Sequence, residues 1–263
     1  MRAALALILC LACSPVTPVA AAGDDEVDVE LVLAVDASNS MDKEEFALQR
    51  AGYVNALLTP EFLNAVQSGR HGRIALTYFE WSGSIRQGSI IPWQIIDGHN
   101  SATVFAGKLA ALPLGGSSGG TSISSAVAFG ASLLAQSKLQ GERRIIDISG
   151  DGPNNTGGPV AAVRDEAVSG GIIINGLPIL IRPSQMTAAM FGTVDRYYSD
   201  CVTGGPGSFV LPIHDASEFA TAIRLKLILE VSGLAARPRV LAVAALPVDC
   251  LVGEHYRLFY PDP

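Results

Sequence analysis

The sequence predicts an α/β fold with a doubly wound, mostly parallel central sheet and helices on both faces. Short apolar segments that suit buried parallel strands alternate with segments at helical spacing over most of the chain. The 263 residues allow one domain with a large core and do not require two. Hydrophobic residues form 49% of the chain and charged residues 16%, which is typical of a globular protein rather than a disordered one.

The first predicted strand covers residues 27–35, VDVELVLAV. Its first half alternates between polar and apolar residues and its second half is continuously apolar, as in a strand that enters the middle of a covered parallel sheet. Pro92 lies inside another predicted strand and indicates an edge position, because proline has no amide hydrogen to donate to a neighbour. The further predicted strands cover residues 73–81, 85–96, 143–149, 171–181 and 208–213.

The predicted helices complete the alternation. Residues 42–58 place Phe46, Tyr53, Val54 and Leu57 at helical spacing, and the acidic residues of the first turn favour the positive end of the helix dipole. The other predicted helices cover residues 101–112, 121–136, 159–169, 185–198 and 216–231.

The chain divides into three predicted segments. Residues 1–22 are typical of an export signal, because Arg2 precedes a short apolar run and small residues precede an acidic stretch. A lipid attached to Cys13 is the alternative interpretation. Residues 23–234 form the predicted domain, and residues 235–263, which contain four prolines, form an appendage. We therefore expect an exported protein, periplasmic or extracellular, with no transmembrane segment after the signal.

Charge and cysteine content narrow the possible partners. The net charge of −7 argues against nucleic acid and anionic membrane surfaces, which attract basic proteins. Cys201 and Cys250 lie outside the signal and could form one disulfide in an oxidising compartment or remain two buried thiols. Because no two cysteines of the domain are closely spaced, a cysteine-ligated zinc site is not expected.

Three loops carry oxygen-bearing side chains that could converge. Asp36, Ser38 and Ser40 alternate along the first loop and can point the same way; Thr121 follows a glycine-rich segment, and Asp151 ends an apolar strand. In a doubly wound fold, sites form beyond the carboxyl ends of the strands, where these loops should meet. Such oxygens suit Mg²⁺, Mn²⁺ or Ca²⁺ better than zinc or copper. The alternative is that they only cap helices and turns.

The charge of these five side chains allows an additional acidic ligand to bind the cation. Asp36 and Asp151 neutralise a divalent cation, while the other three side chains are neutral hydroxyls. A further carboxylate, from an Asp or Glu of a protein partner, would therefore meet little repulsion and would still be attracted by the ion.

The pattern Asp36-x-Ser38-x-Ser40 after an apolar strand, with Thr121 after a glycine-rich loop and Asp151 after a later strand, resembles the metal-ion-dependent adhesion site of von Willebrand factor A domains. The resemblance implies that the first four side chains bind the cation directly and that Asp151 often acts through water. It also implies that an acidic residue of a partner completes the coordination.

The resemblance covers roughly residues 27–232 and implies one antiparallel edge strand in the sheet. The stretches LVLAVDASNSMDKEEFALQR, ISGDGPNN and INGLPIL also resemble a bacterial group of exported A-domain proteins of undefined function. One departure is Gly150, because many A domains have a threonine directly before the aspartate.

We therefore expect a cation-dependent, adhesion-type protein-binding module rather than an enzyme. A structural subunit of an envelope complex, in which the metal only staples three loops, is the first alternative. A serine hydrolase is the second: Gly116-x-Ser118-x-Gly120 matches the letters of a nucleophile elbow, and Asp151 and His214 follow in order. A true elbow needs a buried strand before the serine, and Ser118 lacks one.

Overall fold

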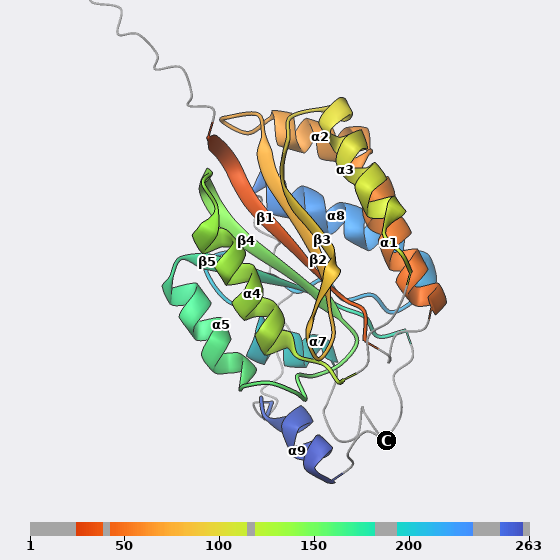
Figure 1. Cartoon of the computed structure of the whole chain (residues 1–263), viewed down its shortest axis with the longest axis vertical. Helices are drawn as coiled ribbons and strands as arrows, with labels where there is room; N and C mark the ends of the chain where they lie inside the picture. Colours follow the sequence, from red (N-terminus) through yellow and green to blue (C-terminus); the bar gives the residue numbers. More distant parts are fainter. Residues whose placement is uncertain (1–24, 39–42, 115–118, 182–193, 234–247, 260–263) are drawn as a thin grey trace, which may run out of the picture.

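A five-stranded sheet in the order β3-β2-β1-β4-β5 forms the centre of the fold (Figure 1). The computed structural model describes residues 25–38, 43–114, 119–181, 194–233 and 248–259. The strands are β1 (Glu26–Asp36), β2 (Ile74–Trp81), β3 (Ile85–Ile96), β4 (Gln140–Gly150) and β5 (Ile172–Pro178). β1 pairs in parallel with β2 and β4, and β4 with β5, whereas β3 runs antiparallel to β2 at the edge. The mostly parallel sheet and its antiparallel edge strand are thus confirmed.

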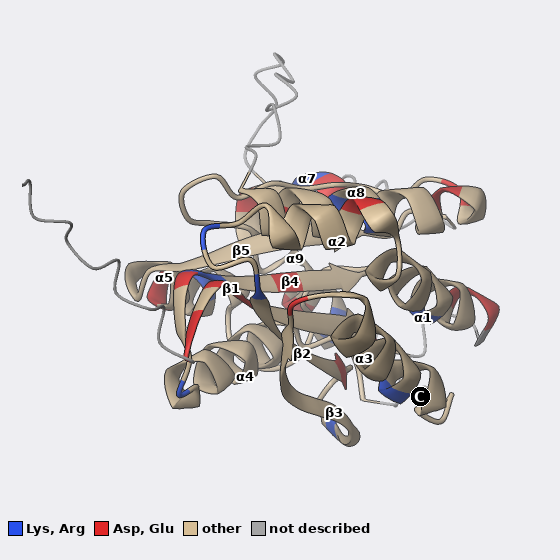
Figure 2. Ribbon diagram, turned by 90° about the horizontal axis from the view of Figure 1, so that it is seen from above, with Lys and Arg blue, Asp and Glu red and all other residues tan. Residues whose placement is uncertain are grey.

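Helices cover both faces of this sheet (Figures 1 and 2). One layer contains α1 (Lys43–Leu57), α2 (Pro60–Gln67), α3 (His99–Ala111) and α8 (Phe219–Ser232). The other contains α4 (Ile123–Gln136), α5 (Val160–Ser169), α7 (Val194–Tyr197) and the π-helix η1 (Tyr198–Val202). Successive β1 side chains alternate between the layers: Leu31 and Leu33 pack into the first core, and Val32 and Ala34 into the second.

Among the described helices, none is long and apolar enough to cross a membrane. Acidic and basic residues are distributed over both helical layers and the ends of the sheet (Figure 2).

Three features differ from the sequence prediction. Residues 208–213 were expected as a strand, but they form only two isolated bridges, Gly176 with Val210 and Ile179 with Ile213. The amides of Leu211 and Ile213 still donate to the carbonyl oxygens of Gly176 and Pro178, so the segment follows β5 without forming a regular strand. α2 was not expected, and neither was α9 (Val252–Phe259), which lies within the segment predicted as an appendage. The predicted signal peptide lies outside the described residues.

Three buried charges link β4 to α8. The ammonium group of Lys226 lies 2.6 Å from Asp147 Oδ1 and also contacts the carboxylate of Glu230 one helical turn away. The side chains of all three residues are fully buried. Asn175 and Tyr53 donate further hydrogen bonds to the two carboxylates, at 3.1 Å and 3.3 Å. Two carboxylates thus share one cation inside the core, an arrangement that is costly unless every member keeps its partners.

Glu230 is expected to make the folded protein less stable as the pH rises. Burial, with the nearby charge of Asp147, raises the pKa of Glu230 from 4.5 to about 7, although Lys226 opposes this. Between these two values the folded state holds a proton that the unfolded state has released, so the free energy of unfolding falls as the pH increases. Urea unfolding measured between about pH 5 and pH 7 should show this slope, and Glu230→Gln should make it shallower by the contribution of this one proton.

The exposed Glu61 on α2 supplies the control. Glu61→Gln should leave the slope unchanged, because this carboxylate is at the surface. An equally steep pH dependence in Glu230→Gln would contradict the assignment.

Candidate metal centre

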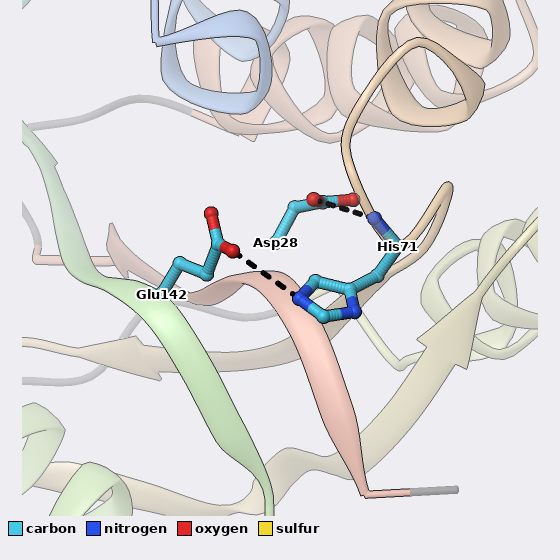
Figure 3. A group of neighbouring side chains, drawn as sticks. All are labelled: Asp28, His71 and Glu142. Carbon is cyan, nitrogen blue, oxygen red and sulfur yellow. Dashed lines mark hydrogen bonds and ion pairs between the residues drawn. The ribbon is translucent and has the colours of Figure 1, made fainter. Parts of the chain in front are cut away.

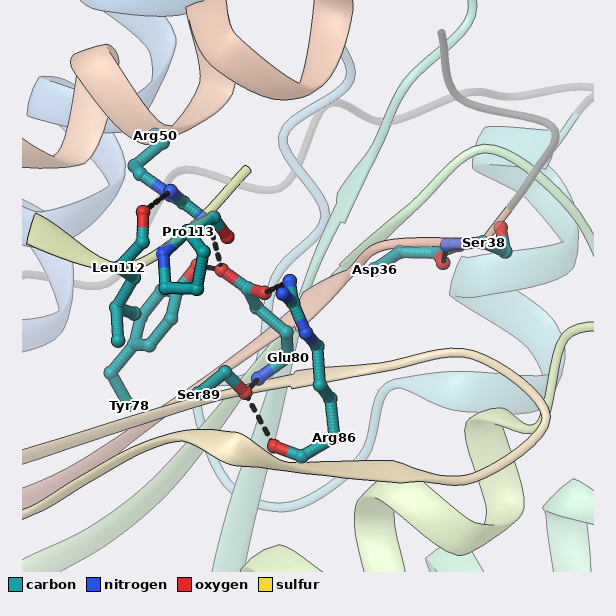
Figure 4. A network of polar contacts seen from close by, with 9 residues as sticks. All are labelled: Asp36, Ser38, Arg50, Tyr78, Glu80, Arg86, Ser89, Leu112 and Pro113. Atoms are coloured by element: carbon teal, nitrogen blue, oxygen red, sulfur yellow. Dashed lines mark hydrogen bonds and ion pairs between the residues drawn. The ribbon is translucent and has the colours of Figure 1, made fainter. Parts of the chain in front are cut away.

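Asp36, the last residue of β1, has a buried carboxylate of which one oxygen accepts no hydrogen bond (Figure 4). The backbone amide of Ser38 donates a hydrogen bond of 2.7 Å to Asp36 Oδ1. Among the described residues, Asp36 Oδ2 is buried and has no hydrogen-bond partner. A buried carboxylate oxygen without a donor is unfavourable, so this atom is a natural position for a cation to contact.

Asp151 follows β4 and brings a second carboxylate to the same place. Val35 and Ser149 are paired in the ladder, so β1 and β4 end side by side. Burial, and then the negative charge of Asp151, raise the pKa of Asp36 to about 8, while hydrogen bonds from Ser38 and from the backbone of Asp151 lower it. A divalent cation at this place would stabilise the ionised form of Asp36, which the nearby charge of Asp151 disfavours.

Thr121 lies on the loop that precedes α4, which is hydrogen-bonded to the end of β2. The amide of Ala37 donates to Trp81 O at 2.7 Å, and the amide of Ser122 donates to Ser82 O at 2.8 Å. The loop after β1, the end of β2 and the start of α4 therefore lie next to one another. Ser122 caps α4, so Thr121 precedes the helix rather than opening it.

A second set of bonds ties Thr121 to the loop after β4. The amide of Thr121 donates to Asn155 Oδ1 at 2.8 Å, and the amide of Asn155 donates to Thr121 O at 2.9 Å. The structure thus brings the loops of Asp36, Thr121 and Asp151 to one edge of the sheet. Ser40 lies outside the described residues.

These residues fit a hard divalent cation. Two carboxylates and the hydroxyls of Ser38 and Thr121 are the oxygen donors that Mg²⁺, Mn²⁺ and Ca²⁺ prefer. The unpartnered Oδ2 of Asp36 and the raised pKa of its carboxyl show that the protein alone does not compensate this charge. Their role as metal ligands remains a prediction.

The neighbours of Gly150 explain why this chain has a glycine where many A domains have a threonine. A Cβ at Gly150 would lie 2.6 Å from Tyr198 Oη and 2.8 Å from Asp36 Oδ2, too close for either atom to stay in place. Tyr198 is fully buried, and burial together with the charges of Asp36 and Asp151 raises its pKa well above the ordinary value. Its hydroxyl therefore stays protonated, and both this oxygen and Asp36 Oδ2 lie within 2.8 Å of the position that a Cβ at Gly150 would take. Sequence reasoning missed Tyr198, which comes from a distant segment.

A buried ion network supports the loops around the site (Figure 4). Glu80 is fully buried, and its carboxylate contacts Arg50 at 2.5 Å and Arg86 at 2.6 Å. Arg50 also donates to the carbonyl oxygen of Leu112 at 2.5 Å. This network joins α1, the end of β2 and the segment that leads into the glycine-rich loop. A lone glutamate within the apolar strand RIALTYFEW was the sequence signal that could have indicated it.

A different group of possible metal ligands lies at the opposite end of β1 (Figure 3). Ligand atoms of Asp28, His71 and Glu142 all lie within 4.8 Å of one another. Asp28 already accepts hydrogen bonds from the amides of His71 and Arg73, at 2.9 Å and 3.3 Å, and His71 Nε2 lies 3.3 Å from Glu142 Oε1. These contacts satisfy Asp28 without an ion. The sequence did not indicate this group, because its members come from three separate elements.

Comparison with solved structures finds folds similar to this one, including a von Willebrand factor type A protein. Proximal thread matrix protein 1 from the mussel byssus superposes with a TM-score of 0.56 at 14% identity, over 79% of this chain and 49% of its own. The von Willebrand factor type A protein from Catenulispora acidiphila gives 0.51 at 14% identity, over 78% and 43%. The pilus adhesin SpaC from Lactobacillus rhamnosus GG gives 0.53 at 15% identity, over 79% and 31%.

The chain thus spans about half or less of the length of these three structures. At such low identity the likeness concerns the fold alone. One structure of the mussel protein is described as having a zinc-occupied metal-ion-dependent adhesion site.

Sequence comparison gives the family. No curated protein matches the chain in sequence. A family model matches residues 26–235, which include all five strands and helices α1 to α8. The chain therefore belongs to the family described as "Protein of unknown function (DUF1194)".

Proposed function

We propose that this chain is a divalent-cation-dependent protein-binding module. Asp36, Ser38, Ser40, Thr121 and Asp151 hold Mg²⁺, or Mn²⁺ or Ca²⁺ in its place, and an Asp or Glu of a protein partner completes the coordination. The observation that carries the proposal is the buried, unpartnered Oδ2 of Asp36 beside the charge of Asp151. The proposed activity is binding and not catalysis.

The arrangement supports binding at an open face. The three loops lie beyond the carboxyl ends of parallel strands, where ligands bind in doubly wound sheets. Structures of similar fold include a pilus adhesin and a protein with a metal-occupied adhesion site, which supports the same use here. The disulfide between Cys201 and Cys250 supports export to an oxidising compartment.

The serine hydrolase alternative has little support. Asp151, which would have to serve a histidine, lies beside Asp36 instead, and Ser118 lies outside the described residues. His214 donates its amide to Glu218 at 2.8 Å, in the turn that precedes α8.

Calorimetric titration tests the metal site first. The chain without residues 1–22 is treated with EDTA, desalted and titrated with Mg²⁺, Mn²⁺, Ca²⁺ and Zn²⁺ in turn. We expect one ion per chain, and absence of binding by all four would overturn the proposal. Zn²⁺ is included because the mussel protein holds it.

Binding of an acidic partner is tested next. Peptides selected from a display library in the presence of Mg²⁺ should lose binding when EDTA is added and when their Asp or Glu is replaced by Asn or Gln. Retained binding after both changes would contradict the proposal. If metal removal lowers the melting temperature but no acidic peptide depends on it, the ion is structural and the chain is a scaffold.

A further inference from the structure

Helix α9 lies outside both helical layers, below the carboxyl edge of the sheet (Figure 1). It is also outside the residues that match the family model, which end at 235. A disulfide between Cys201 in η1 and Cys250 fixes the start of this segment to the domain. Tyr197, next to η1, donates a further hydrogen bond to the carbonyl oxygen of Cys250 at 3.3 Å.

The first contact of α9 is with the loop after β4. Asn154 is fully buried and donates its side-chain amide to Glu254 Oε1 at 2.7 Å. Asn154 Oδ1 in turn accepts from the amide of Ser124 in the first turn of α4, at 3.0 Å. A Cβ at Gly253 would lie 2.1 Å from Asn154 O, so the helix backbone packs directly on this loop. Glu254, together with the carbonyl oxygen of Gly158 at 3.2 Å, therefore holds the side chain that connects the loop to α4.

The second contact is with the glycine loop that leads to Thr121. Arg257 Nη1 lies 3.5 Å from Gly119 O, a long hydrogen bond. A Cβ at Gly120 would lie 2.6 Å from the same nitrogen and 2.7 Å from Asn155 Oδ1. Gly120 has a φ of 91°, which a residue with a side chain rarely adopts, so the close approach needs glycine here.

These two contacts enclose Thr121. On one side, Glu254 holds Asn154, whose neighbour Asn155 exchanges two hydrogen bonds with the Thr121 backbone. On the other side, Arg257 lies against Gly119 and Gly120, the two glycines that precede Thr121. Both loops carry proposed metal ligands, so their relative position decides whether those ligands converge.

We infer that Glu254 and Arg257 are positioning residues for the metal site: α9, anchored by the Cys201–Cys250 disulfide, holds the loops of Thr121 and Asp151 in the arrangement that binds the cation. This inference rests on the proposed function for its metal. Residues that orient ligands from outside the coordination shell commonly change metal affinity by about 10- to 100-fold.

Two measurements test it on the chain without residues 1–22. The first is Mg²⁺ and Mn²⁺ affinity by calorimetry. The second is hydrogen exchange, without metal, at the amides of Thr121, Asn155 and Ser124. In the double variant Glu254→Ala/Arg257→Ala we expect about 10-fold weaker metal binding and about 10-fold faster exchange at these amides, with exchange in β1 unchanged. Cys201→Ser/Cys250→Ser should shift both measurements in the same direction.

Two variants serve as controls. Glu254→Gln keeps an oxygen that can accept the hydrogen bond from Asn154, so it should retain most of the affinity. Arg70→Ala removes an exposed arginine that pairs with Glu142 at the opposite end of the sheet, and it should change neither measurement.

The outcomes separate this inference from the proposed function. If the unmodified chain binds metal and the double variant matches it in affinity and exchange, the inference is wrong and the metal site stands. If the unmodified chain binds no cation, the proposed function fails. Exchange then decides the inference: faster exchange at the three amides supports loop positioning, and unchanged exchange overturns it. Faster exchange throughout β1 would indicate a general stability effect and would also overturn it.

Discussion

Replacing Asp36 by alanine is expected to abolish cation binding and partner binding while leaving the fold intact. Asp36 is the most buried charged ligand of the proposed site, and its Oδ2 is the oxygen without a protein donor. Its loss removes one of the two negative charges that balance a divalent ion. The change should weaken metal affinity by at least about 100-fold, more than the loss of a residue outside the coordination shell. Calorimetry with Mg²⁺ and Mn²⁺ measures the effect directly.

The stability of Asp36→Ala distinguishes lost function from lost folding. Near neutral pH and in EDTA the variant should melt at or above the temperature of the unmodified chain, because it removes a buried carboxyl whose pKa is raised to about 8. Asp165→Ala on α5 is the matched control, since that carboxylate is 70% exposed. Unchanged partner binding in Asp36→Ala would show that the mechanism is wrong.

Replacing Lys226 by methionine is expected to destabilise the protein by about 3–5 kcal/mol, because it leaves Asp147 and Glu230 buried without their cation. The contact of the ammonium group with the Phe209 ring, 5.5 Å from its centroid, is lost as well. Urea unfolding at neutral pH gives the magnitude. The loss should shrink as the pH falls, because protonated carboxyls no longer need the cation.

An exposed lysine supplies the comparison for Lys226. Lys108→Met on α3 removes a surface ammonium group that donates to Gln94, so its effect should stay within about 0.5 kcal/mol. A Lys226→Met variant that is as stable as Lys108→Met would mean that the buried charges are compensated in another way.

The central strands could be predicted because their sequences contain nearly continuous apolar runs, whereas the order of the strands could not. β1, β4 and β5 are buried on both faces, which only a covered parallel sheet allows. α2 was missed although Thr59 and Pro60 carry a helix-start signal: Thr59 accepts a hydrogen bond from the amide of Phe62. Its eight residues are too few for helical periodicity to stand out.

α9 was missed for a different reason. The prolines on both sides of it suggested only an appendage to the domain, whereas its position depends on the bond between Cys201 and Cys250. The sequence allowed either a disulfide or two buried thiols, and the structure shows the disulfide. A cross-link between residues 49 positions apart is a tertiary fact that local patterns do not contain.

The residues of the candidate site also fall into those that local sequence patterns predict and those that depend on tertiary contacts. Asp36, Ser38, Thr121 and Asp151 could be proposed because each follows a strand or precedes a helix, and strand ends converge in this fold. Tyr198 and Glu254 could not be proposed, because their roles depend on which distant side chain they meet. Residues that support a site from a distance rarely have a sequence pattern of their own.

The contact between Gly150 and Tyr198 has a consequence for relatives of this chain. The space that a side chain at position 150 would fill is taken here by the phenol oxygen of residue 198. A relative with threonine at position 150 must therefore have a shorter residue at position 198, and the two positions should vary together across an alignment. Frequent coexistence of threonine and tyrosine at these positions would mean that the ring can swing away.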